Sequence, residues 1–303
     1  MIGRHSFNWE RDFENVQIFL GEVLENFSIL NWIPSRLENI RFGPCGSEYS
    51  SDDVKGLRIW AIESKIVALA ITERIGLDYY IQTHPKFKFL EKDIVLWIEK
   101  QGRENKQKKP KQIINIFALE NDEERITLLK TLEYQNLGLW EYNRKRSLTL
   151  PVPDYKLPNG YTIRSIRVEE DYRQLKEVLT SVFPHCSAMT EQRFRLFATA
   201  SFYNQDLDLV VVAPDGVTFT AFCTIRMDPL SRIAELEPVG THPNYRRLGL
   251  AKAVICEGLQ RLMKYHPSMI CISGAATTDA ANELYDSLGF NEKFEVHKWQ
   301  KIV

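Results

Sequence analysis

The sequence predicts a mixed α/β fold in which a mixed sheet with flanking helices occurs twice, in two tandem domains. In the second half, strand-like and helix-like segments follow the order strand, two helices, three strands, helix, strand, helix, strand. The helix between the fourth and fifth strands predicts a crossover that joins parallel neighbours. The first half repeats part of this plan. The expected domains are residues 1–146 and 161–303, joined by a linker at 147–160.

The linker is predicted from its composition. Three prolines and one glycine lie between residues 147 and 160, where they favour an extended connector over helix or strand. After it, the turn signal Pro214-Asp-Gly separates two β-rich runs, as in a hairpin. Strands are expected at 161–166, 207–212, 217–225, 233–239, 269–273 and 294–301, and helices at 171–183, 190–201, 248–265 and 279–288.

Two matches between the halves indicate a tandem duplication. The run Thr83-His-Pro-Lys-Phe-Lys-Phe-Leu recurs 158 residues later as Thr241-His-Pro-Asn-Tyr-Arg-Arg-Leu. A second run, Leu128-Leu-Lys-Thr-Leu-Glu-Tyr, recurs 156 residues later as Leu284-Tyr-Asp-Ser-Leu-Gly-Phe. In the first half, a strand-like run precedes the first match and a helix-like run at 93–100 follows it. Because the two matches keep their order and nearly the same offset, we interpret them as copies of one ancestral unit.

Composition and charge argue against several kinds of function. The chain has 303 residues and a net charge of −1, so no whole-molecule field draws it to nucleic acid or to an anionic membrane. No apolar run approaches the ~20 residues that cross a bilayer, and no signal-peptide core is visible. The five cysteines are scattered, so we expect neither a zinc site nor a disulfide framework, in a reduced cytoplasmic protein. The lysine-rich stretch 103–111 is expected to be a solvated loop rather than an anion site.

The strongest candidate for a phosphate site is the loop that opens the helix expected at 248–265. It reads Arg246-Arg-Leu-Gly-Leu-Ala-Lys. The first turn of a helix leaves N–H groups without internal partners and carries partial positive charge, and a diphosphate satisfies both. Gly249 and Ala251 are small enough for the backbone to approach phosphate oxygens. Arg246, Arg247 and Lys252 add positive charge, although a glycine at this place can also be only a turn residue.

This loop belongs to a longer pattern. The run His242-Pro-Asn-Tyr-Arg-Arg-Leu-Gly-Leu-Ala-Lys fits the signature Gln/Arg-x-x-Gly-x-Gly/Ala. A second run, Ala280-Ala-Asn-Glu-Leu-Tyr-Asp-Ser-Leu-Gly-Phe, fits an alanine-rich helix that ends in Leu-Tyr-x-x-x-Gly-Phe, and its Tyr285 lies 39 residues after Arg246. Through these paired motifs, residues 161–303 resemble the GNAT superfamily of acyl-CoA-dependent N-acyltransferases.

The resemblance implies transfer of an acetyl group from acetyl-CoA to a primary amine by direct attack, without a metal. It implies a β-bulge before the loop, where backbone groups bond the pantetheine arm, and Pro238 supports this because proline fits a bulge. The implied acceptor is a small-molecule amine or a peptide N-terminus. The protein is expected to be a monomer or weak dimer that binds neither nucleic acid nor membrane. The residues expected to bind CoA are Val239, Thr241, Arg246, Arg247, Leu248, Gly249, Leu250, Ala251, Lys252 and Asn282.

Three residues are candidates for proton transfer. By resemblance, Tyr285 is the general acid, since its ordinary pKa near 10 lies close to the roughly 8.5 of a thiol. The alternative is a core tyrosine whose hydroxyl is bonded nearby. Glu235 is slightly favoured over Glu237 as the general base, but either can be an ordinary solvated carboxylate.

Other polar residues near these motifs have simpler interpretations. Asn282 lies one turn before Tyr285 and can equally be a helix-surface residue. His185 and Cys186 lie in the acceptor-side loop and are expected to be plain loop residues, because direct attack needs no cysteine.

The first half is expected to be degenerate. At the positions that match Gly249, Ala251, Glu235 and Tyr285, it carries Glu91, Asp93, Leu77 and Leu129. Two carboxylates at a diphosphate site repel the ligand. The first domain is therefore expected to be a pseudo-domain that packs on the second and closes one side of the acceptor pocket. The alternative for the whole protein is a non-catalytic acyl-CoA-binding sensor.

Overall fold

The computed structural model describes residues 2–45, 54, 56–72, 78–104 and 112–303. Leu77 and most of the lysine-rich stretch, residues 105–111, lie outside this part of the chain. The elements of the first half are β1 (Ile2–Ser6), α1 (Trp9–Phe27), α2 (Pro34–Phe42), β2 (Arg58–Ile62), β3 (Lys65–Thr72), β4 (Asp78–Thr83), α3 (Glu91–Glu104), β5 (Ile113–Leu119), α4 (Glu123–Thr131) and β6 (Gln135–Arg146).

The second half follows with the predicted alternation. Its elements are β7 (Thr162–Ser165), α5 (Tyr172–Val182), α6 (Glu191–Phe197), β8 (Asp208–Val212), β9 (Phe219–Met227), β10 (Ile233–Thr241), α7 (Leu250–Leu262), β11 (Met269–Ala275), α8 (Asp279–Ser287) and β12 (Glu292–Ile302). Every strand and helix expected from the sequence in this half is present, and the fold class is mixed α/β as predicted. No helix among the described residues has the length and apolar character needed to cross a membrane.

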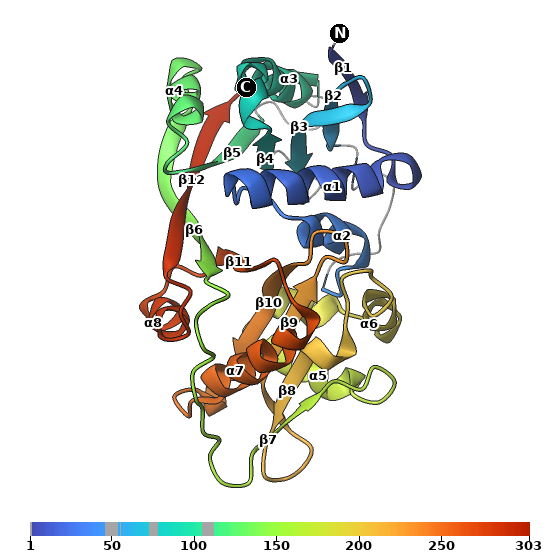
Figure 1. Cartoon of the computed structure of the whole chain (residues 1–303), viewed down its shortest axis with the longest axis vertical. Coiled ribbons are helices and arrows are strands. Elements are labelled where there is room, and N and C mark those ends of the chain that lie inside the picture. Colours follow the sequence, from blue (N-terminus) through green and yellow to red (C-terminus); the bar gives the residue numbers. More distant parts are fainter. Residues whose placement is uncertain (1, 46–53, 55, 73–77, 105–111) are drawn as a thin grey trace.

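All the strands named above form one sheet in the order β1-β2-β3-β4-β5-β12-β6-β11-β10-β9-β8-β7. The order is symmetric about its middle. In the first half the strands from β2 to β4 are antiparallel neighbours and β4 pairs with β5 in parallel. In the second half the strands from β8 to β10 are antiparallel neighbours and β10 pairs with β11 in parallel. Figure 1 shows the two halves at opposite ends of the molecule, with β6 and β12 running along one side between them.

The repeated His-Pro run has the same local structure in both halves. In the first, Nδ1 of His84 accepts a hydrogen bond from the backbone N–H of Lys86 at 3.2 Å, and a 3-10 turn begins at the proline. In the second, Nδ1 of His242 accepts from the N–H of Asn244, also at 3.2 Å, and again a 3-10 turn follows. The sequence repeat is therefore a structural repeat, with the turn at the same point after β4 and after β10.

The last strands of the two halves are exchanged. β6, from the first half, pairs with β11 and β12, while β12, from the second half, pairs with β5. The final residues of β6 are polar and buried, and they lie in the second half: Asn143, Arg144, Lys145 and Arg146. Arg144 donates to the carbonyl of Phe290 at 2.9 Å, and Arg146 donates to that of Leu288 at 2.9 Å. Buried arginines from one half thus satisfy backbone carbonyls of the other.

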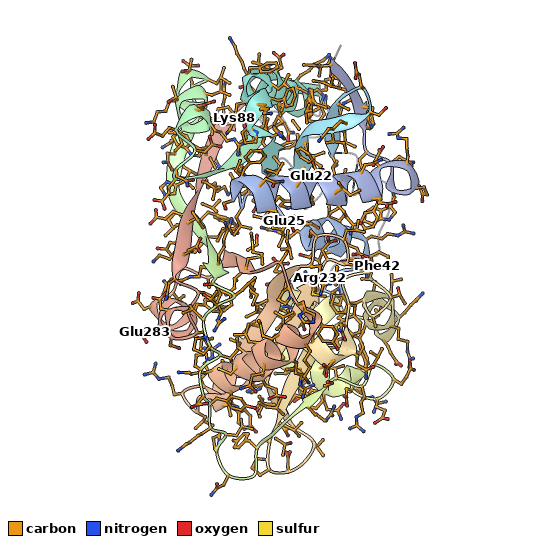
Figure 2. All side chains as sticks on the ribbon, in the orientation of Figure 1. Glu22, Glu25, Phe42, Lys88, Arg232 and Glu283 are labelled. Carbon is orange, nitrogen blue, oxygen red and sulfur yellow. A yellow bond between two sulfur atoms is a disulfide. The ribbon has the colours of Figure 1, made fainter. Side chains whose placement is uncertain are left out.

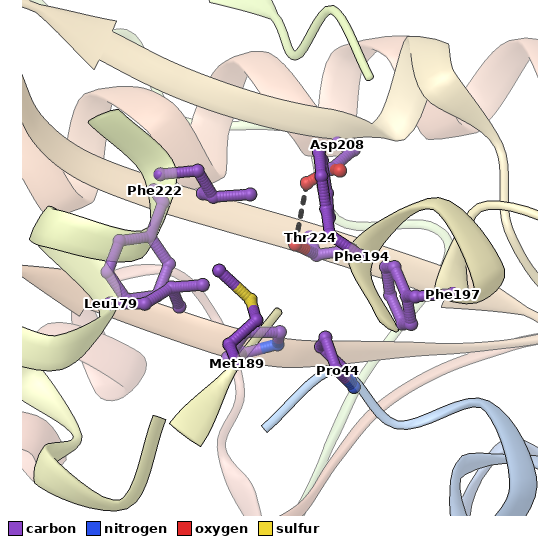
Figure 3. A pocket seen from close by; sticks show the side chains of 10 residues that line it. Pro44, Leu179, Met189, Phe194, Phe197, Asp208, Phe222 and Thr224 are labelled. Atoms are coloured by element: carbon purple, nitrogen blue, oxygen red, sulfur yellow. Dashed lines mark hydrogen bonds between the residues drawn. The ribbon is translucent and has the colours of Figure 1, made fainter. Parts of the chain in front are cut away.

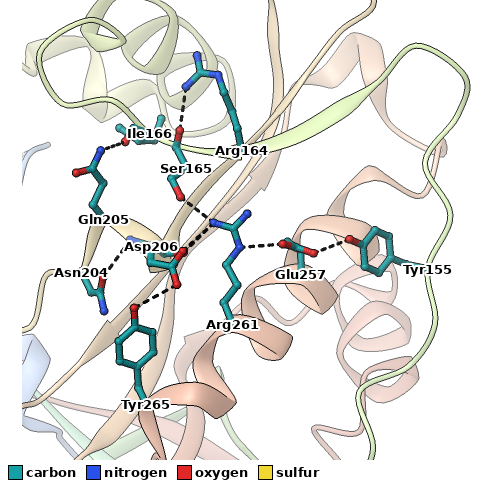
Figure 4. A network of polar contacts seen from close by, with 10 residues as sticks. All are labelled: Tyr155, Arg164, Ser165, Ile166, Asn204, Gln205, Asp206, Glu257, Arg261 and Tyr265. Carbon is teal, nitrogen blue, oxygen red and sulfur yellow. Dashed lines mark hydrogen bonds and ion pairs between the residues drawn. The ribbon is translucent and has the colours of Figure 1, made fainter.

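The segment between β6 and β7 contains no helix or strand, but it is anchored on the second half. The hydroxyl of Tyr155 donates to the carboxylate of Glu257 in α7 at 2.6 Å, and Arg261 donates to the same carboxylate at 2.8 Å (Figure 4). Arg261 also donates to Oγ of Ser165 in β7 at 2.8 Å. This network ties the connecting segment, the C-terminal part of α7 and β7 together.

The first two helices of the chain pack on the second half. Gln17 in α1 donates to Asp228 at 2.9 Å, and the hydroxyl of Ser201 donates to Glu38 in α2 at 2.8 Å. Apolar contacts accompany these bonds, and Figure 2 places Phe42 at the boundary between the halves, where it packs against the phenylalanine cluster that includes Phe197. The α1–α2 pair therefore covers part of the second half as well as its own sheet.

The expectation that the chain has no disulfide is wrong. Cys45, which follows α2, is bonded to Cys186 in the 3-10 turn after α5, with a Cα–Cα distance of 4.3 Å. The two cysteines are 141 residues apart, so no local spacing in the sequence predicts that they pair. The bond adds a covalent link between the halves. Cys223, Cys256 and Cys271 are buried free thiols, as expected for small apolar residues.

Candidate active site

An opening in the sheet lies between β10 and β11. These parallel strands pair only from Ile233 to Glu235, and the register of β10 against β9 shifts between Leu236 and Val239. The bulge predicted at Pro238 is confirmed. Beyond it β10 stays paired with β9 on one side only, so its backbone groups on the β11 side are available to a ligand.

The predicted phosphate loop follows this opening. Arg247 and Gly249 both have left-handed backbone conformations, with φ values of 67° and 78°. A Cβ placed on Gly249 would meet nothing within 4 Å, so the space beside the loop is open. Helix α7 begins at Leu250 without a side-chain cap, which leaves its first N–H groups for an external acceptor. The open space, uncapped helix start and exposed Arg246 suit a diphosphate.

The matching position in the first half is filled by an internal ion pair. Glu91 is buried, and its carboxylate accepts two hydrogen bonds from Arg125, at 2.9 and 2.6 Å. Lys88 lies 3.0 Å from the same carboxylate and also donates to Asp122. Glu91 and Asp122 balance the charges of Lys88 and Arg125, so these four side chains present no net positive charge to a diphosphate.

Glu235 is a buried carboxylate on the last residue of β10 that pairs with β11. Its Oε2 accepts a hydrogen bond from the hydroxyl of Ser35 at 2.7 Å, and its Oε1 has no partner among the described residues. Burial raises the pKa of Glu235 to about 7, Arg226 and Arg36 oppose the rise, and Glu237 adds to it. A carboxylate with such a pKa can accept a proton at neutral pH.

Tyr285 belongs to α8 and packs against the apolar core of the second half. Its ring is 6.2 Å from that of Phe290, and the guanidinium of Arg144 lies 5.9 Å from its centre. Burial, with the nearby carboxylate of Glu237, raises the pKa of Tyr285 well above its ordinary value. The close match to the pKa of a thiol that the sequence argument used is therefore absent in the folded protein. The side chain of Tyr285 is half-buried, and its hydroxyl has no hydrogen-bond partner among the described residues.

The carboxylate of Glu237 raises the pKa of each of the other two candidates for proton transfer, Glu235 and Tyr285. Asn282 is less accessible than the sequence suggested. Its Oδ1 accepts from Arg144 and its Nδ2 lies 3.4 Å from the carbonyl of Thr277.

Sequence reasoning missed the contribution of the first half to this site. Ser35 contacts Glu235, the adjacent Arg36 donates to Ser273 of β11 at 2.9 Å, and Arg144 supports α8. No motif contains these residues. The one sequence signal was the run of polar residues at the end of β6. Polar side chains that are buried in a strand need hydrogen-bond partners from elsewhere in the fold, so this run could have indicated a contact with the second half.

A narrow crevice lies beside the bulge on the face covered by α5 and α6. Its volume is about 20 Å³, enough for a water molecule. Asp208 forms its polar end, where its carboxylate accepts from Thr224 at 2.7 Å (Figure 3). The remaining lining is apolar and consists of Pro44, Leu175, Leu179, Met189, Phe194, Phe197, Phe222 and Pro238.

A parallel strand pair that a bulge opens, followed by a helix start without a side-chain cap, is the arrangement that the resemblance to acyl-CoA-dependent acyltransferases implied. Residues 172–290 match the family model described as the acetyltransferase (GNAT) family, and this part of the chain belongs to that family. Enzymes of the family use acetyl-CoA and acetylate amine acceptors. A search of curated protein sequences finds no match.

Solved structures share the fold over nearly the whole chain. The tandem GNAT protein from the clavulanic acid biosynthesis pathway is 10% identical, with a TM-score of 0.66, and the match covers 100% of this chain and 98% of that one. A GCN5-related N-acetyltransferase from Sphaerobacter thermophilus is 15% identical, with a TM-score of 0.65 and coverage of 98% and 95%. A GNAT-family acetyltransferase from Colwellia psychrerythraea is 10% identical, with a TM-score of 0.55 and coverage of 88% and 95%. At such identities the likeness shows the fold, here a tandem GNAT fold.

Proposed function

We propose that the protein is an N-acetyltransferase that moves an acetyl group from acetyl-CoA to a primary amine by direct attack within a ternary complex. The observation that carries the proposal is Glu235, which lies where β10 and β11 separate. It is a buried carboxylate with a pKa of about 7, and one of its oxygens has no partner among the described residues. A protein that only binds acyl-CoA needs no such group.

The proposed CoA site follows the opening and the loop. The diphosphate binds the backbone of residues 248–252, with Arg246, Arg247 and Lys252 around it, and the pantetheine arm bonds to the backbone of Val239 and Thr241. Asn282 contributes less, because Arg144 already holds its amide oxygen. The first half binds no CoA, because Glu91 and its ion pairs fill the corresponding position.

In the proposed reaction the amine nitrogen attacks the thioester carbonyl, so that a C–N bond forms and the C–S bond breaks. Glu235 takes a proton from the attacking nitrogen, directly or through a water, and Glu237 is the alternative base. A backbone N–H at the bulge polarises the carbonyl. Tyr285 gives its proton to the departing sulfur. Afterwards Glu235 releases its proton to solvent and Tyr285 takes one up, so both groups return to their starting states.

Acetyl-CoA incubated with a panel of primary amines should release free thiol at a rate that depends on the amine. Calorimetric titration should give one CoA site per chain, because only the second half has an open loop. If the protein binds acetyl-CoA but releases no thiol with any amine, it is instead a non-catalytic acyl-CoA-binding sensor. Two equivalent CoA sites would contradict the proposal that the first half binds no CoA.

Turnover at saturating acceptor should rise with pH through a midpoint near 7. Glu235 accepts a proton only when ionised, so kcat increases as pH passes upward through its pKa. Glu235→Gln should remove this limb and lower the plateau by about 10²-fold. Glu237→Gln is the matched control, and it should keep the limb but move it to lower pH, because Glu237 raises the pKa of Glu235. A limb that survives in Glu235→Gln would assign it to another group.

A further inference from the structure

One hydroxyl of the first half reaches the proposed base. Ser35 is the second residue of α2, it is buried, and it donates to Oε2 of Glu235 at 2.7 Å across 200 residues of sequence. The serine cannot turn to water instead, because both side chains are buried. The contact is therefore a fixed part of the packing between the halves.

The same contact decides which oxygen of Glu235 is free. With Oε2 held by Ser35, Oε1 is the oxygen without a partner among the described residues. The start of α2 favours the charged form of this carboxylate as well. The helix begins with Pro34 and has no side-chain cap, so the partial positive charge of its first turn lies beside Ser35.

We propose that Ser35 is a positioning residue for Glu235. The first half then takes part in catalysis, in addition to packing on the second half. Ser35 fixes the carboxylate so that Oε1 receives the proton of the attacking amine, and it stabilises the ionised form. This inference rests on the proposed function of the same site.

The groups around Glu235 set the expected change in pH dependence. They are Arg226 on β9, Glu237 on β10, Cys271 on β11, and Ser35 with Arg36 on α2. A hydrogen bond to the charged form lowers the pKa of a carboxyl group. Removing the Ser35 hydroxyl while the other groups stay in place therefore raises the pKa of Glu235 above its present value near 7.

Ser35→Ala should raise the midpoint of the kcat–pH profile by about one unit and lower turnover at pH 6 by about tenfold. The affinity for acetyl-CoA should stay within about twofold of wild type, because Ser35 lies outside the phosphate loop. In a Glu235→Gln background the same change should have no further effect on turnover. Ser35→Thr, which keeps the hydroxyl, should keep the wild-type midpoint, and it also serves if the alanine variant does not fold.

Ser201→Ala is the matched control. It removes another serine–glutamate bond across the same boundary, from Ser201 to Glu38 at 2.8 Å, and it should leave the midpoint unchanged. An active wild type with an unshifted profile in Ser35→Ala would overturn the role of Ser35 and leave the proposed function standing. A wild type that binds acetyl-CoA but acetylates no amine at any pH would overturn both.

Discussion

Gly249→Glu should abolish CoA binding. The substitution places a carboxylate beside the diphosphate and imposes a left-handed conformation on a residue with a Cβ, at a φ of 78°. Like charges brought together at a binding site cost several kcal/mol, so the affinity should fall by at least about 10²-fold. The first half carries Glu91 at the same place in its repeat.

Gly216→Glu is the control for this experiment. Gly216 lies in the turn between β8 and β9 with a φ of 74°, and a Cβ added to it would meet nothing within 4 Å. The same substitution there introduces the same charge and backbone strain away from the loop, and it should leave CoA affinity unchanged. If the Gly249 variant folds and binds CoA within a few-fold of wild type, the assignment of the phosphate loop is wrong.

Tyr285→Phe should lower kcat by roughly 10²–10⁴-fold, the span expected for loss of a general acid. CoA affinity should change little, since the ring and its packing remain. Thermal stability should hardly change either, because none of the described residues hydrogen-bonds the hydroxyl that is removed. Steady-state kinetics with any working acceptor, together with a melting curve, measures both effects.

Tyr265→Phe gives the opposite pattern and is the control. The Tyr265 hydroxyl donates to Asp206 at 3.2 Å at the far end of α7, so its loss should cost about 1 kcal/mol of stability without affecting turnover. Full turnover per folded molecule in Tyr285→Phe would remove Tyr285 from the mechanism and leave water as the proton source.

The sequence predicted the second half well because its signals are local. Helical spacing, alternation and turn residues each act within a few positions, and they located every strand and helix from β7 to β12. Pro238 announced the bulge for the same reason, since a proline cannot donate to a neighbouring strand. The loop at Gly249 was recognisable as a candidate phosphate site because helix starts that bind phosphate have strict local requirements.

The parts that escaped prediction depend on residues far apart in the chain. Cys45 and Cys186 share no spacing pattern, and Ser35 reads as an ordinary residue near a helix start until α2 is seen against β10. Arg144 looked like part of the first half and proved to be buried in the second. In each case the packing of the two halves brings the two residues together. The periodicity of a single sequence does not predict that packing.

The exchange of β6 and β12 has a consequence for how the protein is made. In a growing chain β5 has no neighbour on this side until residues 292–302, which follow it far along the sequence, have been synthesised. The first half therefore cannot close its own sheet while the second is still being translated, and an apolar strand edge of this kind invites pairing with other chains. The sheet of the first half is therefore completed only by a strand of the second half.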